Sequence, residues 1–222
     1  MLKAVIMDFD GVIIDTEVVW YEIFKEWFKE HYGYDLSITE FLTCVGSSAK
    51  DLFLQMKEQN NIVVDEELFA KDTTNQFIAK SDMLPIKSGV RNFIIEVKSK
   101  GLKVALATSS TRKKPIKHLK RLGLLDYFDE IITAEDVERI KPFPDLFLEA
   151  VERLNIEPSE AIIVEDSTNG LKAGFKAGIK VLVVPNEVTK YSTFDNYYRM
   201  VERLDEVNVG QLIDYYQEEE CC

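Results

Sequence analysis

Short hydrophobic runs alternate along the chain with segments in which hydrophobic residues recur every three or four positions. The short runs are rich in β-branched residues and typical of buried strands, and the periodic segments indicate helices. The strands predicted in this way are Leu2–Asp8, Leu102–Ala107, Glu130–Thr133, Ala161–Val164 and Ile179–Val184. The helices predicted among them are Gly89–Lys100, Lys113–Leu122, Pro144–Leu154, Thr168–Ala177 and Gln211–Gln217. Strands separated by helices indicate an α/β fold with a doubly wound parallel sheet.

One long segment near the N-terminus departs from this alternation, because it has helical periodicity and no convincing strand. Its predicted helices are Thr16–Tyr32, Ser47–Asn60 and Asp65–Ala79, with Thr16 as the N-cap of the first. We interpret residues 15–84 as an inserted α-helical cap domain, and residues 1–14 and 85–222 as a Rossmann-like core. The linkers between the two are expected at Ile13–Asp15 and Met83–Ser88.

Composition narrows the classes of partner. The chain has 222 residues, a formal net charge of −12 and a pI near 4.8. This acidic balance argues against nucleic acid or an anionic membrane surface as a partner. No apolar stretch approaches the length of a membrane span, and no signal peptide is evident. A monomer is the default expectation.

The cysteines indicate a reducing compartment. The chain has Cys44 and an adjacent pair, Cys221 and Cys222, which we expect to be frayed at the end of the chain. Three cysteines in these positions form neither a disulfide framework nor a metal-binding spacing. We therefore expect a cytoplasmic protein.

Polar side chains follow three of the predicted strands. Asp8 and Asp10 come at the end of the first strand, Thr108–Ser110 follow another, and Glu165–Ser167 follow a third. Because ligands bind outside the carboxyl ends of parallel strands, these groups are expected to meet at one edge of the sheet. Oxygen ligands alone suit Mg²⁺, which keeps waters and is completed by a substrate phosphate.

Each of these groups also has a purely structural interpretation. Asp8 and Asp10 could form a strand-end turn, since aspartate favours turns. Thr108–Ser110 and Glu165–Ser167 could cap the helices that follow them, although a capped helix N-terminus can also bind an anion. Lys141 alone would ordinarily be a solvated lysine. The joint order of the groups along the chain is what indicates a site.

Four motifs together resemble those of the haloacid dehalogenase (HAD) superfamily, in order and over the whole chain. They are the first motif Asp8-Phe9-Asp10-Gly11-Val12, the second Thr108-Ser109, the third Lys141-Pro142 and the fourth Glu165-Asp166-Ser167. The placement of the cap resembles the subgroup that contains β-phosphoglucomutase and sugar-phosphate phosphatases. The resemblance implies phosphoryl transfer to a carboxylate, with Mg²⁺ as cofactor and a small phosphorylated metabolite as substrate.

The resemblance also implies roles for individual residues. Asp8 would be the nucleophile and Asp10 the general acid and base. Thr108 and the backbone N–H of Ser109 would bind phosphate oxygens, and Lys141 would neutralise the nucleophile. The metal would be held by the residues Asp8, Asp10 (through its carbonyl), Glu165 and Asp166.

The cap bears on whether the chain is a phosphatase or a mutase. Where β-phosphoglucomutases carry a histidine in the first cap helix, this chain has Trp20. In the cap loop that contains Gly46, Ala49 replaces an arginine that binds a second phosphate, and Lys50 is adjacent. Both departures favour a phosphatase acting on a sugar phosphate, with Trp20, Gly46 and Lys50 as expected substrate contacts. Trp20 could instead simply pack within the cap.

Two alternatives remain open from the sequence. One is a mutase of the β-phosphoglucomutase type. The other is a non-catalytic receiver or binding module, because receiver domains also place Asp, Thr and Lys around Mg²⁺. Receiver domains are shorter, however, and they lack both an inserted cap and a second aspartate on the first strand.

Overall fold

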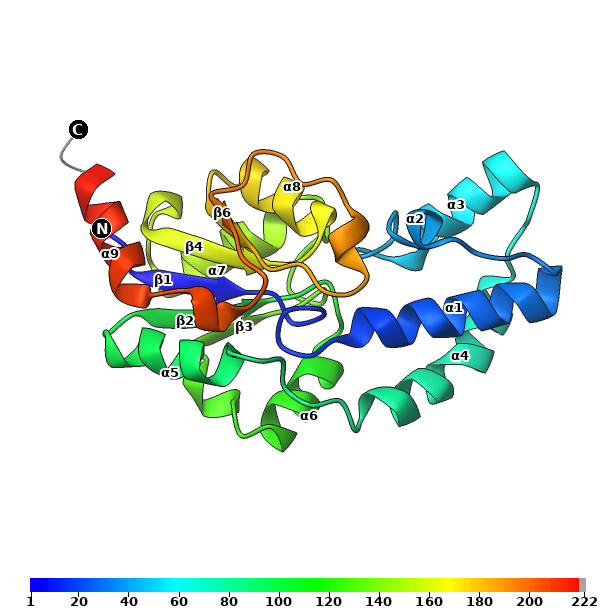
Figure 1. Cartoon of the computed structure of the whole chain (residues 1–222), viewed down its shortest axis with the longest axis horizontal. Coiled ribbons are helices and arrows are strands. Elements are labelled where there is room, and N and C mark those ends of the chain that lie inside the picture. The colour runs from blue at the N-terminus through cyan, green and yellow to red at the C-terminus, as the bar shows by residue number, and fades with distance from the viewer. Residues whose placement is uncertain (220–222) are drawn as a thin grey trace.

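A twisted parallel sheet forms the centre of the molecule (Figure 1). The computed structural model describes residues 1–219, so Cys221 and Cys222 lie outside the described residues. The strands are β1 (Ala4–Met7), β2 (Lys103–Ala107), β3 (Glu130–Ile132), β4 (Ala161–Glu165), β5 (Lys180–Val183) and β6 (Arg199–Met200). Their order in the sheet is β3-β2-β1-β4-β5-β6, with every pair parallel. The predicted doubly wound α/β core is confirmed.

Helices cover both faces of the sheet. They are α5 (Val90–Ser99), α6 (Lys113–Arg121), α7 (Asp145–Leu154), α8 (Thr168–Lys176) and α9 (Val209–Glu219). Successive residues of β1 point to opposite faces, as strand geometry requires. Val5 and Met7 pack in the hydrophobic cluster that includes α5 and α9. Ala4 and Ile6 pack in the cluster that includes α7 and α8. Burial on both faces explains why the central strand β1 is apolar throughout.

Four helices stand apart from the sheet, beyond the carboxyl end of β1, and the N-terminus and α9 lie at the opposite end of the molecule (Figure 1). They are α1 (Thr16–Tyr32), α2 (Ile38–Phe41), α3 (Ala49–Asn60) and α4 (Glu66–Ser81). A largely aromatic cluster holds them together, with Phe24 packing edge-on against Phe41 and Phe69. We propose that these helices form a cap domain with bounds at residues 15 and 84.

The two segments that join the cap to the core lie side by side. The backbone N–H of Lys87 donates to the carbonyl of Ile13 at 2.9 Å. The ammonium of Lys87 also donates to the carbonyl of Gly11. The chain therefore leaves the core and returns to it at nearly the same place.

Several details differ from the sequence predictions. The N-cap of α1 is Asp15 rather than Thr16, and Thr16 instead donates its hydroxyl hydrogen to Asp10. Helix α2 and strand β6 were not predicted, because four and two residues are too few to show a period. Among the described helices, none combines the length and the low polarity that crossing a bilayer requires.

Candidate active site

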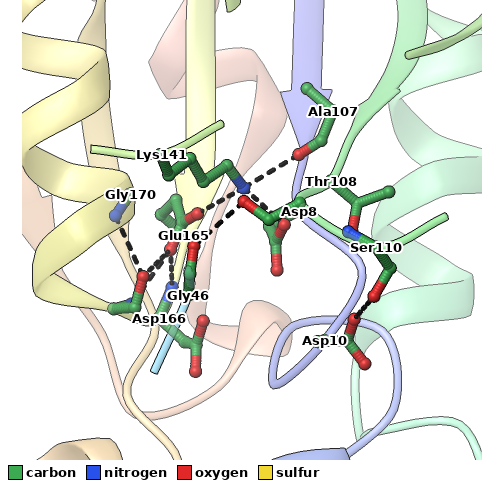
Figure 2. Close-up of polar contacts among 12 residues, drawn as sticks. Asp8, Asp10, Gly46, Ala107, Thr108, Ser110, Lys141, Glu165, Asp166 and Gly170 are labelled. Atoms are coloured by element: carbon green, nitrogen blue, oxygen red, sulfur yellow. Dashed lines mark hydrogen bonds and ion pairs between the residues drawn. The ribbon is translucent and has the colours of Figure 1, made fainter. Parts of the chain in front are cut away.

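A buried lysine lies at the centre of the polar groups (Figure 2). The Lys141 ammonium donates to the Asp8 carboxylate, to Oε1 of Glu165 at 2.7 Å and to the carbonyl of Ala107 at 2.9 Å. Only 1% of the Lys141 surface is exposed. Burial favours the neutral amine, but the carboxylates of Asp8 and Glu165 reverse that effect and raise the pKa of Lys141. The lysine is therefore charged, not solvated, and paired on both sides.

Both carboxylate oxygens of Glu165 are engaged by the protein. Oε1 accepts from Lys141, while Oε2 accepts from the backbone N–H groups of Asp166 at 2.8 Å and Ser167 at 2.9 Å. The side chain presses against the first turn of α8, where a Cβ on Gly170 would lie 1.8 Å from the Glu165 Cδ. Only glycine fits there. The structure thus directs Glu165 toward Lys141 and the helix.

Asp10 lies at the edge of the same group. Its carboxylate accepts hydrogen bonds from Thr16 and Ser110, and it pairs with the Lys114 ammonium at 2.6 Å. Burial alone would raise the pKa of Asp10, but the charge and hydrogen bonds of Lys114, with the two hydroxyls, lower it below its usual value. Asp8 contrasts with it, because burial outweighs Lys141 and raises the pKa of Asp8 to about 7.

Asp166 lies on the other side of Asp8 and is 1% exposed. Its Oδ2 accepts a hydrogen bond from Asn186 Nδ2 at 2.6 Å. Gly11 passes so close that a Cβ there would lie 2.1 Å from that oxygen, and its φ of +80° also favours glycine. Burial, followed by the charge of Glu165, raises the pKa of Asp166 well above its usual value.

These residues fit a divalent cation on their donor chemistry and on their charge. Asp8 and Asp166 each present one oxygen that accepts no hydrogen bond from the described residues, and the Asp10 carbonyl belongs to the same loop. Oxygen donors of this kind are those that Mg²⁺ takes. Burial raises the pKa of Asp8 and Asp166, and the neighbouring carboxylate of Glu165 raises both further, so a bound cation would relieve an excess of buried negative charge. Among the described residues, no three or more Asp, Glu, His or Cys side chains are grouped so that they could hold a metal ion, so the fit rests on two carboxylates and a backbone carbonyl.

The hydroxyl groups after β2 do not cap the next helix. The N-cap of α6 is Arg112, which makes no side-chain cap bond. Instead Thr108 Oγ1 accepts from the backbone N–H of Ser110 at 3.1 Å, so the Thr108 hydroxyl hydrogen can be donated elsewhere. Ser167, by contrast, does cap α8 by accepting from the N–H of Gly170 at 3.0 Å. The capping interpretation therefore holds for the fourth motif only.

A loop of the cap is docked on the core at this site. The carbonyl of Gly46 accepts from the hydroxyl of Ser109 at 3.0 Å, and Asn169 Nδ2 donates to the carbonyl of Val45 at 2.8 Å. A Cβ on Gly46 would lie 2.2 Å from Ser167 Oγ, and its φ is +75°. Gly46 is thus one of the points where the cap backbone contacts the core (Figure 2).

A cavity of about 210 Å³ lies between core and cap. We call its core side the floor, which consists of Asp8, Asp10, Thr108, Ser109, Ser110 and Lys114. We call its cap side the roof, which consists of Glu17, Trp20, Phe24, Phe41, Cys44, Val45, Gly46, Ser47, Ala49 and Phe69. The floor is polar and charged, whereas the roof is mostly aromatic and aliphatic.

The expected cap contacts have different outcomes. Trp20 and Gly46 line the cavity. Trp20 also stacks on Phe77 with ring centroids 4.0 Å apart, so it packs within the cap as well. Lys50 is exposed on α3 and does not line the cavity, which removes the reason to expect it as a substrate contact.

Two charged residues of the cavity were not identified from the sequence. Glu17 is 7% exposed, and burial together with the charge of Asp10 raises its pKa to about 8. It lies one helical turn before Trp20, so its spacing could have placed it on the same face of α1. Lys114 lies in the first turn of α6. It reaches Asp10 only because of how that helix is oriented on the sheet, which the sequence does not show.

Comparison with known proteins bears directly on this arrangement. The model of a family described as "Haloacid dehalogenase-like hydrolase" matches residues 5–184, a range that includes all four motifs. The chain belongs to this family. It is therefore a HAD-like hydrolase, and membership of a family of enzymes argues against a non-catalytic receiver module.

Relatives of this HAD-like chain carry phosphatase names. A Bacillus subtilis (strain 168) protein named "Putative phosphatase YhcW" is 37% identical over 97% of this chain and 98% of its own length. A Thermotoga maritima protein named "Phosphorylated carbohydrates phosphatase" is 33% identical over 81% of this chain and 83% of its own length. The crystal structure of a β-phosphoglucomutase from Clostridium difficile is similar over all of both chains, with a TM-score of 0.82 and 26% identity.

Proposed function

We propose that this HAD-like hydrolase is a Mg²⁺-dependent phosphatase that hydrolyses a small phosphate monoester, of the sugar-phosphate class, through an aspartyl-phosphate on Asp8. The observation that supports this most is the pairing of Asp8 with a fully buried, charged Lys141, with Asp10 beside the same cavity. Phosphoryl transfer depends chiefly on positioning and charge neutralisation, and these residues supply both.

In the first step the Asp8 carboxylate attacks phosphorus and the bond to the leaving-group oxygen breaks. Lys141 balances the charge gathered on Asp8 and the transferring group. The Thr108 hydroxyl and the Ser109 N–H face the phosphate oxygens. Asp10 in its protonated form gives a proton to the leaving alkoxide, and Thr16 and Ser110 hold its carboxyl group in place. Because Lys114 and these hydroxyls lower the pKa of Asp10, this step requires that the substrate react with the protonated form.

In the second step Asp10 takes a proton from water, which attacks the phosphorus of the aspartyl-phosphate. The bond from phosphorus to the Asp8 oxygen breaks, so inorganic phosphate leaves and the Asp8 carboxylate is restored. The same carboxylate thus acts first as an acid and then as a base.

Asp8, the Asp10 carbonyl and Asp166 would hold Mg²⁺. When bound, the cation neutralises the carboxylates and the phosphate oxygens, which is its usual contribution to such chemistry. The resemblance implies that Glu165 helps to hold the metal, and we propose that it does so indirectly. Since both of its oxygens are bonded within the protein, it holds Lys141 beside Asp8 and orders the start of α8.

The roof of the cavity favours a phosphatase over a mutase. A mutase that passes through a bisphosphate needs a cation for the second phosphate. Among the residues that line the cavity, Lys114 is the only lysine or arginine, and it belongs to the floor, where it is paired with Asp10. The roof presents Glu17, which would repel a second phosphate if ionised and supply no positive charge if protonated. These contacts favour a substrate with one phosphate group.

The test is a phosphate-release assay over sugar phosphates, phosphoglycolate and nucleotides, with Mg²⁺ and with EDTA. We expect Mg²⁺-dependent release from a small monophosphate and none in EDTA. Isomerisation of β-glucose 1-phosphate, measured in parallel, identifies a mutase. Isomerisation faster than hydrolysis would overturn the phosphatase assignment, and no turnover of any ester would overturn the mechanism.

A further inference from the structure

Asn186 uses both ends of its side-chain amide. It follows β5 and is 6% exposed. Its Nδ2 donates to Asp166 Oδ2 at 2.6 Å, while its Oδ1 accepts from the backbone N–H groups of Val188 at 2.8 Å and Thr189 at 2.9 Å. Because two N–H donors face Oδ1, the amide orientation is fixed and Nδ2 must face the carboxylate. One side chain therefore joins Asp166 to a tight turn.

The turn from Asn186 to Thr189 is itself anchored in both modules. Thr189 is fully buried, and its hydroxyl oxygen accepts from the backbone N–H of Asn186 at 2.9 Å. Val188 is 3% exposed and packs in the aromatic cluster of the cap with Phe24 and Trp27. A residue that lies more than a hundred positions after the cap in the sequence is thus part of the cap's hydrophobic core.

Asp166 has little room to move between its neighbours. A Cβ on Gly11 would lie 2.1 Å from Asp166 Oδ2 and 2.7 Å from Asn186 Nδ2, so the loop after β1 closes over their hydrogen bond. With Oδ2 fixed by Asn186, the other carboxylate oxygen has one direction in which to meet a cation.

We propose that Asn186 is a positioning residue for Asp166, and that the turn it caps ties this carboxylate to the cap through Val188. The inference rests on the proposed Mg²⁺ site. Groups that hydrogen-bond a metal-binding carboxylate fix its direction, and their loss typically weakens metal binding. Because coupling between two sites is reciprocal, docking of the cap on Val188 and binding of the cation at Asp166 favour one another.

The first test is titration of the whole protein with Mg²⁺ alone. Binding is measured by calorimetry and by the shift in melting temperature. The variant is Asn186→Ser, since a serine hydroxyl can still accept from the N–H groups of the turn but is too short to donate to Asp166. The matched control is Asn208→Ser. Asn208 is exposed, and its Oδ1 also accepts a hydrogen bond from a backbone N–H, that of Gln211, at 3.0 Å.

We expect Asn186→Ser to raise the dissociation constant for Mg²⁺ by about 10- to 100-fold, and Asn208→Ser to leave it unchanged. A folded Asn186→Ser protein that binds Mg²⁺ as tightly as the wild type would overturn the positioning role. Wild-type protein that binds no Mg²⁺ would overturn the metal site itself, a result that the wild-type titration reports separately from either variant.

The second test addresses the link to the cap. Val188→Ala is compared with Val207→Ala. Val207 is also buried, at 5% exposure, but it packs in the hydrophobic cluster that includes α5 and α9. Both should lower the melting temperature measured in EDTA. Only Val188→Ala should also raise the Mg²⁺ dissociation constant, by about fivefold, the low end of common coupling factors. Equal Mg²⁺ affinity in the two variants would show that the carboxylate is not tied to the cap.

Discussion

The floor and the roof of the cavity are built in opposite ways. All floor residues except Lys114 follow strand ends, and the Asp8 and Asp10 side chains are held by hydrogen bonds and by lysines. Roof residues lie on helices and a loop, and most contact the cavity through aromatic or aliphatic surface. A rigid polar floor suits a reaction that every phosphate ester shares. A mostly apolar roof suits the part of the substrate that differs between esters.

The largest expected effect comes from Asp8→Asn on the floor. The change keeps the shape of the side chain but removes the charge and the nucleophile. Turnover should fall by at least about 10⁴-fold, or roughly 5 kcal/mol in the barrier. The measurement is phosphate release, with circular dichroism to show that the variant is folded. Turnover near that of the wild type would exclude the covalent mechanism.

The next largest effect is expected when the buried lysine is replaced, and it should lower stability as well as turnover. Lys141→Met leaves Asp8 and Glu165 facing each other without a counter-charge. Breaking such a buried pair should cost about 3–5 kcal/mol of unfolding free energy, measured with urea. The control is Lys117→Met, whose exposed pair with Asp82 should contribute far less to stability, because solvent screens it. Similar losses in the two variants would mean that burial of Lys141 adds nothing.

Asp10→Asn tests the acid on the floor. Turnover of an alkyl phosphate should fall by about 10²- to 10⁴-fold, because the leaving alkoxide no longer receives a proton. An aryl phosphate with a good leaving group should lose less in the phosphorylation step. Pre-steady-state kinetics on both esters separates that step from hydrolysis of the aspartyl-phosphate. Equal losses in phosphorylation would contradict the acid role.

Trp20→Ala tests the roof and should act on substrate choice. The KM for a sugar phosphate should rise by about tenfold, in line with loss of an aromatic contact of 1–2 kcal/mol. Acetyl phosphate, which is too small to reach the roof, should be affected little. Because Trp20 also stacks on Phe77, Trp20→Phe is the control that retains an aromatic ring. Equal losses on both substrates would mean that Trp20 only holds the cap together.

The smallest effect is expected from Lys50→Ala. Lys50 lies outside the cavity, so KM and substrate preference should stay within about twofold of the wild type, as for most surface changes. A clear loss of activity on sugar phosphates but not on acetyl phosphate would show that Lys50 contacts the substrate. The cap would then have to adopt a position that differs from the one described.

The same contrast explains what the sequence could predict. Strand ends carry their polar residues in short motifs, so Asp8, Thr108 and Asp166 could be placed at one edge from the topology alone. Roof positions depend on how helices rotate against each other, which periodicity does not specify. Lys50 was therefore expected in the cavity, whereas Glu17 was missed although it lies on the face that carries Trp20.

Side-chain contacts between distant segments of the core could not be predicted from the sequence either. Lys114 meets Asp10 because α6 starts close to the loop after β1, and Asn186 meets Asp166 because two loops converge. Thr16 matched the pattern of an N-cap, yet it is the first residue of α1 itself and its hydroxyl donates to Asp10. In each case a contact between distant segments decided the role of a residue whose local pattern was ambiguous.

The hydrogen bond between Lys87 and Ile13 has a consequence for redesign of the enzyme. A segment that leaves and re-enters a domain at neighbouring points can be replaced by one of another length without altering the order of the strands. Residues 15–84 are thus a natural unit for transplantation: a cap from another family member, joined at these two points, would bring a new roof to an unchanged set of reacting groups. Selectivity could in this way be exchanged as a module.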